Sequence, residues 1–171
     1  MPSCRIMIKT KQHTAESIRE LLSTINDPEV PVINIVELGI VREVQLSDDE
    51  ITVTITPTYS GCPAMKMIED EIQRVLQENG FTKISIKTVF APVWTTDWLS
   101  DNAKEKLKNY GIAPPRLVAN SPLLQIELPT IQCPHCNSKN TQVKSEFGST
   151  ACKAYYFCHS CQQAFEYFKS F

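Results

Sequence analysis

The chain has 171 residues, of which 42% are hydrophobic and 21% are charged, and its formal net charge is −2. This length can bury a core in one domain, or in one domain plus a small module. The small net charge excludes a general attraction to nucleic acid or to acidic membranes. No apolar run approaches the ~20 residues that span a bilayer, and the short polar start is unlike a secretory signal.

The cysteine content indicates the cellular compartment. Seven cysteines are present, and four of them form two Cys-x-x-Cys pairs. An odd count with this pairing is typical of reduced metal chemistry and not of a disulfide framework. We therefore expect a cytoplasmic protein that does not associate with membranes.

The first predicted element is a short helix that starts at Thr14. Its apolar residues recur at helical spacing, at Ile18, Leu21, Leu22 and Ile25. Pro28 disfavours a helical conformation in the residue before it, so the helix must end by Asp27. The following segment, residues 27–32, is stiffened by two prolines and carries two carboxylates, those of Asp27 and Glu29.

Two strands, a helix and a third strand follow. An imperfect strand pattern covers residues 36–46, and after a polar turn residues 51–56 alternate apolar residues with threonine. Helical spacing predicts a helix over residues 63–79, and residues 83–89 resemble a third strand. Such a strand–helix–strand unit places strands two and three parallel. Residues 14–113 are therefore predicted to form an α+β or α/β domain, a small mixed three-stranded sheet with packed helices.

Cys62 lies where the second strand ends and the helix begins. Unpaired backbone N–H groups and the positive end of the helix dipole stabilise a thiolate at such a position. The alternative is a small, inert, buried thiol, which is the usual state of a single cysteine. Both interpretations stay open at this point.

A further helix precedes the predicted domain boundary. Thr96 or Asp97 is expected to cap it, Gly111 to end it, and its apolar residues are Leu99, Ala103, Leu107 and Tyr110. Two prolines then open an extended linker, residues 114–130, which contains two more. We place the boundary between the domains in this linker.

The C-terminal region, residues 131–171, carries the strongest chemical signal. Two Cys-x-x-Cys turns are separated by 21 residues, and their cysteines are Cys133, Cys136, Cys158 and Cys161. Four thiolates from two such turns form a tetrahedral zinc site around a hairpin. A module this small buries too little apolar area to fold alone, so the metal supplies free energy. We predict a structural zinc ribbon, although ligand type leaves iron open, and we expect a left-handed backbone at Asn137.

The same region contains one more cysteine and many aromatic residues. Cys152 is either a spare thiol on the ribbon hairpin or an auxiliary functional thiol. Eight aromatic residues lie between Phe147 and Phe171. A small ribbon cannot bury all of them, so we expect some to pack on the first domain or on a partner.

Several motifs resemble known families. Three segments resemble SufT-like proteins and the cytosolic iron–sulfur targeting factors: Asp27-Pro-Glu-Val-Pro-Val32, Glu37-Leu-Gly-Ile-Val41 and Thr56-x-x-Tyr59-x-Gly-Cys62-Pro63. Three others resemble the PaaD family: Trp94-Thr-Thr-Asp-Trp98, Tyr110-Gly-Ile-Ala-Pro-Pro115 and Glu146-Phe-Gly-Ser-Thr-Ala-Cys-Lys153. The resemblance covers nearly the whole chain from about residue 15.

The resemblance implies a function. Members of the PaaD family are accessory components of the phenylacetyl-CoA epoxidase system, a multicomponent di-iron monooxygenase of phenylacetate breakdown. For this chain, the resemblance implies a non-catalytic subunit that helps to assemble an iron or iron–sulfur centre. It also implies contact with the oxygenase or reductase components. Carried onto this sequence, Cys62 is the reactive thiol that takes iron or a cluster transiently, with Asp27 and Glu29 beside it. Whether the chain forms a homo-oligomer that shares this site between its copies is left open by the sequence.

The residues agree with a non-enzymatic role. Of the three histidines, His13 lies in the lead-in and His135 and His159 lie within the Cys-x-x-Cys turns, so we expect no hydrolytic triad. The two Glu-x-x-His pairs of a di-iron bundle are absent. The alternative function is a zinc-ribbon adaptor for protein partners in which Cys62 is inert. Nucleic-acid binding is not expected, because from Thr130 onward only four lysines oppose two glutamates and arginine is absent. Thiol–disulfide catalysis would need a resolving cysteine near Cys62, and the sequence places none locally.

Overall fold

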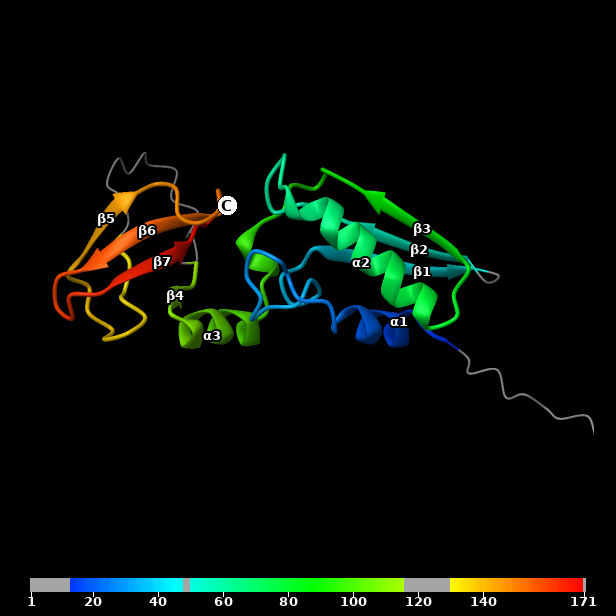
Figure 1. Ribbon diagram of the computed structural model, residues 1–171, viewed down its shortest axis with the longest axis horizontal. Helices are drawn as coiled ribbons and strands as arrows, with labels where there is room; N and C mark the ends of the chain where they lie inside the picture. The colour runs from blue at the N-terminus through cyan, green and yellow to red at the C-terminus, as the bar shows by residue number, and fades with distance from the viewer. Residues whose placement is uncertain (1–12, 48–49, 116–129, 171) are drawn as a thin grey trace, which may run out of the picture.

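The computed structural model describes residues 13–47, 50–115 and 130–170. It contains two sheets that lie one beyond the other along the long axis of the molecule (Figure 1). The predicted linker lies largely outside the described residues, as does the tip of the first predicted turn. The elements are α1 (Ala15–Leu22), β1 (Val41–Ser47), β2 (Glu50–Ile55), α2 (Ala64–Glu78), β3 (Lys83–Thr88), a 3-10 turn (Thr96–Trp98), α3 (Asp101–Tyr110), β4 (Ile112–Ala113), β5 (Thr141–Ser145), β6 (Lys153–Cys158) and β7 (Ala164–Phe168).

The first sheet confirms the predicted mixed three-stranded topology. Its order is β1-β2-β3, with β1 antiparallel and β3 parallel to β2. The apolar residues of β2 are fully buried and its threonines are half-buried, as the alternation predicts. Helix α2 crosses the sheet and α1 packs beside it (Figure 1). The helix predicted from Thr14 is also confirmed, because the Thr14 side chain accepts a hydrogen bond from the Ser17 N–H.

The first strand starts later than predicted. Residues 36–40 form a turn, and β1 begins only at Val41. The Asn34 side chain explains the difference, since its Oδ1 accepts hydrogen bonds from the N–H groups of Val36 and Glu37, at 3.0 and 2.8 Å. A side chain that binds the backbone two and three residues ahead holds a turn in place of a strand.

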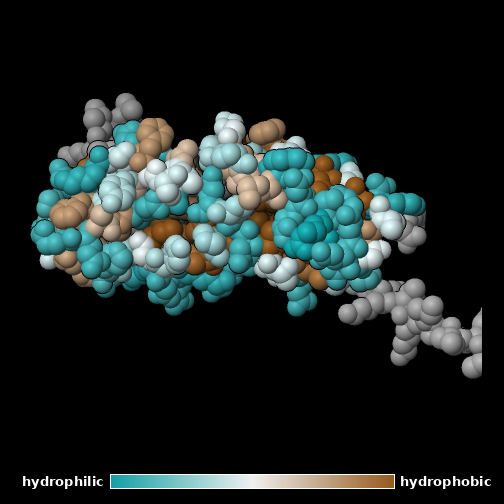
Figure 2. Space-filling model, in the orientation of Figure 1, coloured by the Kyte–Doolittle hydropathy of each residue, from teal (hydrophilic) through white to brown (hydrophobic). Residues whose placement is uncertain are grey.

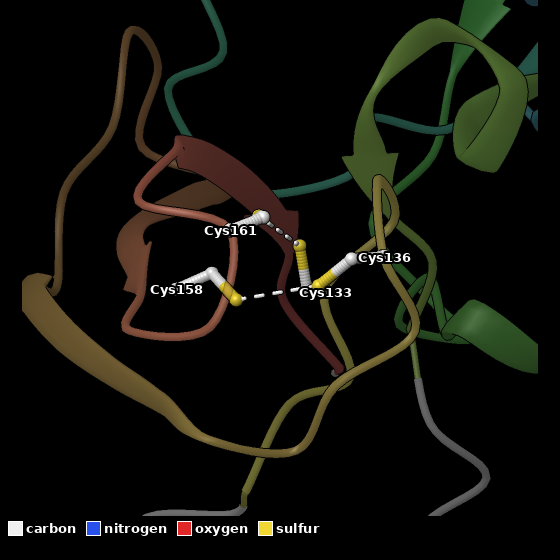
Figure 3. Close-up of side chains that lie close together, drawn as sticks. All are labelled: Cys133, Cys136, Cys158 and Cys161. Atoms are coloured by element: carbon white, nitrogen blue, oxygen red, sulfur yellow. Dashed lines mark hydrogen bonds between the residues drawn. The ribbon is translucent and has the colours of Figure 1, made fainter.

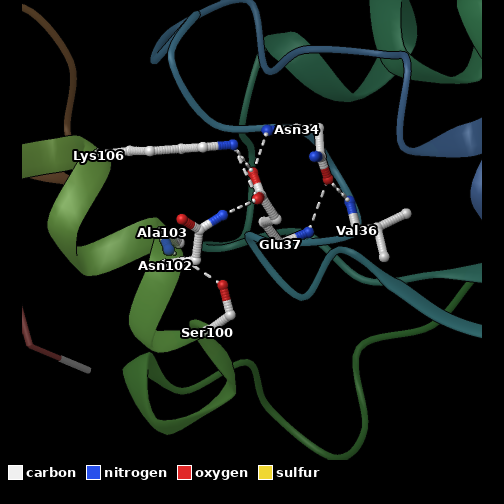
Figure 4. A network of polar contacts seen from close by, with 7 residues as sticks. All are labelled: Asn34, Val36, Glu37, Ser100, Asn102, Ala103 and Lys106. Atoms are coloured by element: carbon white, nitrogen blue, oxygen red, sulfur yellow. Dashed lines mark hydrogen bonds and ion pairs between the residues drawn. The ribbon is translucent and has the colours of Figure 1, made fainter.

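Glu37 ties this turn to α3 (Figure 4). Its carboxylate accepts hydrogen bonds from Lys106 Nζ at 2.8 Å and from Asn102 Nδ2 at 2.6 Å. Partial burial opposes ionisation, but these hydrogen bonds hold the pKa of Glu37 below its ordinary value. This glutamate of the Glu37–Val41 motif therefore has a structural role in the fold.

Helix α3 also begins later than predicted. Its cap is Ser100, whose Oγ accepts a hydrogen bond from the Ala103 N–H at 3.0 Å, and neither Thr96 nor Asp97 caps it. The two expected caps lie in the preceding 3-10 turn. The helix ends at Gly111 as predicted, with a left-handed backbone at φ +93°. A side chain there would also meet the ring of His135, because a Cβ atom would lie 3.1 Å from it.

The second sheet contains the predicted ribbon hairpin and two further strands, β7 and β4. Strands β5 and β6 pair antiparallel between the two Cys-x-x-Cys turns, and β7 extends the sheet on the other side of β6. The short strand β4 was not predicted. It follows α3 directly and pairs parallel with β7, so Ile112 and Ala113 join the ribbon sheet.

The ribbon packs on the first domain, as the aromatic content predicts. Phe168 is 1% exposed and belongs to the core of the first domain, where its ring lies 6.1 Å from that of Trp94. Cys152 is buried in the same core. Figure 2 shows hydrophobic residues in several patches along one face of the molecule. Within the described ranges, no helix has both the length and the hydropathy to cross a membrane.

Replacing Phe168 with alanine tests this packing. We expect Phe168→Ala to lower the free energy of unfolding by about 3–5 kcal/mol, because it leaves a cavity between the ribbon and the first domain. Urea denaturation followed by tryptophan fluorescence measures the change. Phe90→Ala is the matched control, since Phe90 is largely exposed and its truncation should cost about 0.5 kcal/mol or less. Equal losses in the two variants would contradict the docking role of Phe168.

Candidate metal centre and neighbouring thiols

The two Cys-x-x-Cys turns bring four sulfurs together at one end of the ribbon sheet (Figure 3). All four lie within 4.8 Å of one another. Cys133 Sγ is 3.7 Å from Cys161 Sγ, and Cys136 Sγ is 3.5 Å from Cys158 Sγ. Ligands at 2.3 Å around a tetrahedral zinc ion would be about 3.8 Å apart. These separations fit a four-thiolate metal site and are far longer than a disulfide bond of about 2.05 Å.

The two turns have the same backbone geometry. Asn137 has a left-handed backbone at φ 59°, as predicted, and Gln162 has the same φ at the matching place in the second turn. The N–H of the first cysteine in each turn donates to the carbonyl five residues ahead, from Cys133 to Ser138 and from Cys158 to Gln163. The repetition indicates that both turns are built to present sulfur.

Backbone N–H groups point at the first sulfur of each turn. Hydrogen bonds from the N–H groups of Cys161 and Ser160 lower the pKa of Cys158 to about 6. Burial raises the pKa of Cys133, although the N–H groups of Cys136 and His135 oppose this. These N–H groups would stabilise bound thiolates, and four thiolates would leave no open position on the metal. The arrangement therefore fits a closed, structural site.

Loss of one sulfur should abolish this site. We expect Cys158→Ser to bind no metal in the ribbon and to lose the near-ultraviolet circular dichroism of the ribbon aromatics, because the metal supplies folding free energy. Metal analysis and circular dichroism of the purified chain measure both effects. Cys4→Ser serves as the control and should keep one metal per chain. Full metal content in Cys158→Ser would show that the metal lies elsewhere.

Cys62 lies in the loop between β2 and α2, as predicted, and is half-buried. The predicted stabilisation of its thiolate is wrong. Burial raises the pKa of Cys62, and the carboxylates of Glu29 and Asp27 raise it further, although the Ala64 N–H and the Tyr59 hydroxyl oppose them. One backbone N–H at the start of α2 does not outweigh desolvation and two acidic neighbours. Burial and the two carboxylates therefore favour the protonated thiol of Cys62 over its thiolate.

Asp27 has a structural role in the same region. It is buried, and its Oδ1 accepts hydrogen bonds from the N–H groups of Glu29 and Val30 at 2.9 and 2.8 Å. Burial raises its pKa, and those two hydrogen bonds oppose the rise. Asp27 therefore fixes the turn that carries Glu29.

Glu29 faces the ribbon. Its Oε2 accepts a hydrogen bond from the thiol of Cys152, whose sulfur lies 3.6 Å away. Lys153 Nζ donates to the main-chain oxygen of Glu29 at 3.2 Å and pairs with Glu166 at 3.1 Å. Burial raises the pKa of Cys152 to about 11, and Glu29 adds to the rise. The structure thus places Cys152, whose role the sequence left open, beside a predicted site residue of the other domain.

Tyr59 and Lys153 received no role from the sequence. Tyr59 occurs in the quoted motif of the first domain, and Lys153 ends the quoted motif of the ribbon. Burial raises the pKa of Tyr59, and nearby Cys62, Glu29 and Cys152 each raise it further. Tyr59 therefore lies among all three groups. Their occurrence in these motifs was the only indication in the sequence that the two residues matter. The sequence could not show that the motif of the first domain and the motif of the ribbon lie close together in the fold.

The raised pKa of Cys62 gives a pH-dependent prediction. Only the thiolate reacts with iodoacetamide, so we expect Cys62 to be alkylated more slowly than glutathione at pH 7–8 and to need a higher pH. Glu29→Gln removes a negative charge that raises this pKa, so its alkylation profile should move to lower pH. Mass spectrometry of Cys62 after timed alkylation measures both profiles. A profile in the wild type at lower pH than that of glutathione would contradict the assigned direction.

Known protein families match both halves of the chain. The PaaD zinc beta ribbon domain family matches residues 120–169, and the iron–sulfur cluster assembly protein family matches residues 15–85. A crystal structure of a domain of unknown function, DUF59, from Bacillus anthracis is 29% identical, with a TM-score of 0.52, over 54% of this chain and 90% of its own. The fold and the site thus define an iron–sulfur-assembly-type domain joined to a zinc ribbon.

Two relatives narrow this class. A protein of Escherichia coli (strain K12), provisionally named as the D component of 1,2-phenylacetyl-CoA epoxidase, is 46% identical over 87% of this chain and 88% of its own length. An Fe-S protein maturation auxiliary factor of Porphyromonas gingivalis (strain ATCC BAA-308 / W83) is 38% identical over 55% of this chain and 90% of its own length. The chain belongs to the PaaD family, which confirms the resemblance found in the motifs.

Proposed function

We propose that this chain is a non-catalytic, cytoplasmic accessory component of a phenylacetyl-CoA epoxidase system, and that it assists the assembly of an iron or iron–sulfur centre in that system. The family and the named maturation factors among its relatives support an accessory role in iron–sulfur assembly. The observation that carries the proposal is the position of Cys62. This thiol is half-exposed, lies outside the four-cysteine site and has two carboxylates nearby.

The four-cysteine site is proposed to hold zinc and to act only in folding. A site with four protein thiolates has no open position for a substrate. Cys62 is different because its loop provides a single thiol at the rim of the domain. Thiolate and carboxylate ligands suit transient binding of iron. In this proposal Cys62 takes the iron or cluster, and Asp27 and Glu29 shape its surroundings.

Exposed apolar residues near this loop support a protein client. Strand β3 ends beside the end of β2, since the Val89 N–H donates to the Ile55 carbonyl at 2.9 Å. Phe90 and Val93 follow immediately and are 62% and 74% exposed. They therefore lie at the sheet end from which the Cys62 loop leaves. Exposed apolar side chains at such a place favour contact with a partner, which we propose is an oxygenase or reductase component of the epoxidase.

The test is maturation of the epoxidase with and without Cys62. We expect the oxygenase and reductase components, co-expressed with Cys62→Ser, to contain less iron and to show lower activity than with the wild type. Iron analysis of the purified components measures the loss. Ser60→Ala is the matched control, because Ser60 is an exposed neighbour in the same loop. Full iron content with Cys62→Ser would leave the alternative, a zinc-ribbon adaptor with an inert Cys62.

A further inference from the structure

The ribbon contributes a second thiol to the region of Cys62. Cys152 is 123 residues from Glu29 in the sequence, yet its sulfur lies 3.6 Å from the Glu29 carboxylate. Both Cys62 and Cys152 are close enough to Tyr59 and Glu29 for their charges to act on one another. Cys152 and Glu29 are therefore in contact where the two domains join, and Cys62 lies in the same region.

The contact between Cys152 and Glu29 has the dimensions of a metal-ligand pair. A tetrahedral metal with sulfur at 2.3 Å and carboxylate oxygen at about 2.1 Å holds these two ligand atoms about 3.6 Å apart. The Cys152 thiol donates an S–H···O hydrogen bond to the Glu29 carboxylate, so its proton lies between the two atoms. A divalent cation can replace that proton without a change in the separation of the sulfur and the oxygen.

Neighbouring groups hold this pair in place. Asp27 fixes the turn of Glu29 from the first domain. On the ribbon side, the Thr150 hydroxyl lies 3.0 Å from the Cys152 sulfur, and the Lys169 N–H donates to the Cys152 carbonyl at 3.0 Å. The buried ammonium group of Lys153 connects the two sides. Such supporting contacts are what orient metal ligands in proteins.

The third member of the set is less constrained. The atoms of Cys62, Cys152 and Glu29 are not gathered as closely as the ribbon sulfurs, which form the one tight group of potential metal ligands in the described ranges. Cys62 is half-buried, whereas Cys152 is 2% exposed. A preformed inner pair with a looser outer thiol would admit a metal from outside and release it again. A closed site such as that of the ribbon would not.

We propose that Cys62, Cys152 and Glu29 form a second metal site, shared between the two domains, that binds ferrous iron. Binding is a ligand exchange: each thiol loses a proton to solvent, the iron remains in the ferrous state, and the three protein ligands displace all of its water ligands except one, which completes the tetrahedral set. The inference rests on the proposed function, and it adds that the ribbon supplies a ligand. The ribbon then acts in binding as well as in folding.

Cobalt titration of the zinc-loaded, reduced full-length chain tests the site. Co²⁺ is the probe, because thiolate-bound cobalt gives charge-transfer and ligand-field bands. We expect the wild type to bind one equivalent beyond the ribbon metal, and Cys62→Ser, Cys152→Ser and Glu29→Gln each to lose this second equivalent. Asp27→Asn, which removes no ligand but alters the support of Glu29 and a charge near Cys62, should weaken it about 10–100-fold. Cys4→Ser and Glu43→Gln are the matched thiol and carboxylate controls, and both should bind as the wild type does.

The variants also separate folding from ligation. Each variant must keep its ribbon metal and the circular dichroism of the wild type. If Cys152→Ser does not, the loss of the second equivalent is judged from Glu29→Gln, whose side chain has the same shape as that of the wild type. No second equivalent in the wild type, or unchanged binding and band intensity in Cys152→Ser, would overturn the inference. Unchanged binding in Cys152→Ser with failed epoxidase maturation in Cys62→Ser would reject the shared site and leave the proposed function standing. A second equivalent that depends on both thiols, with normal maturation in Cys62→Ser, would leave the site and reject the function.

Discussion

Four sulfurs within 4.8 Å of one another are the constraint on which the ribbon depends. Thiolates at this spacing repel unless a cation lies between them. The ribbon's own apolar core is small, and two of the four cysteines are part of it. A metal that closes the two turns therefore also fixes β6, which ends at Cys158 and starts at Lys153. Cys152 lies directly before the first residue of that strand. Metal binding at Cys158, the last residue of the strand, therefore also helps to fix the position of Cys152.

The junction between the domains combines an apolar contact with a polar one, and the two do different things. Phe168 and Trp94 bury surface, which favours association in almost any register. Lys153 is nearly fully buried and would be costly without partners. Glu166 of the ribbon is one partner, and the other is the Glu29 carbonyl, so the domains must meet where that carbonyl is available. The polar contact thus selects one arrangement among those that the apolar contact allows. That arrangement is the one in which Cys152 faces Glu29.

Local patterns predicted much of this molecule. The period of the apolar residues located the helices and the mixed sheet, and the spacing of the cysteines located both turns of the ribbon. The errors arose where a polar side chain competes locally with the pattern: Asn34 delays the first strand, and Ser100 takes the cap expected at Thr96 or Asp97. Strand β4 was missed because two residues carry no periodicity. The contact of Cys152 with Glu29 depends on how two domains pack, and no local pattern in a single sequence records that.

The short strand β4 has a mechanical consequence. The chain leaves α3 at Gly111 and enters the ribbon sheet at once, where Ile112 and Ala113 pair with β7. A module on a loose tether samples a large volume, and each of its groups meets the other domain only part of the time. A module clamped through a strand keeps its groups at the junction continuously. A client that takes metal from the proposed site would therefore have to reach it while the two domains stay joined through β4.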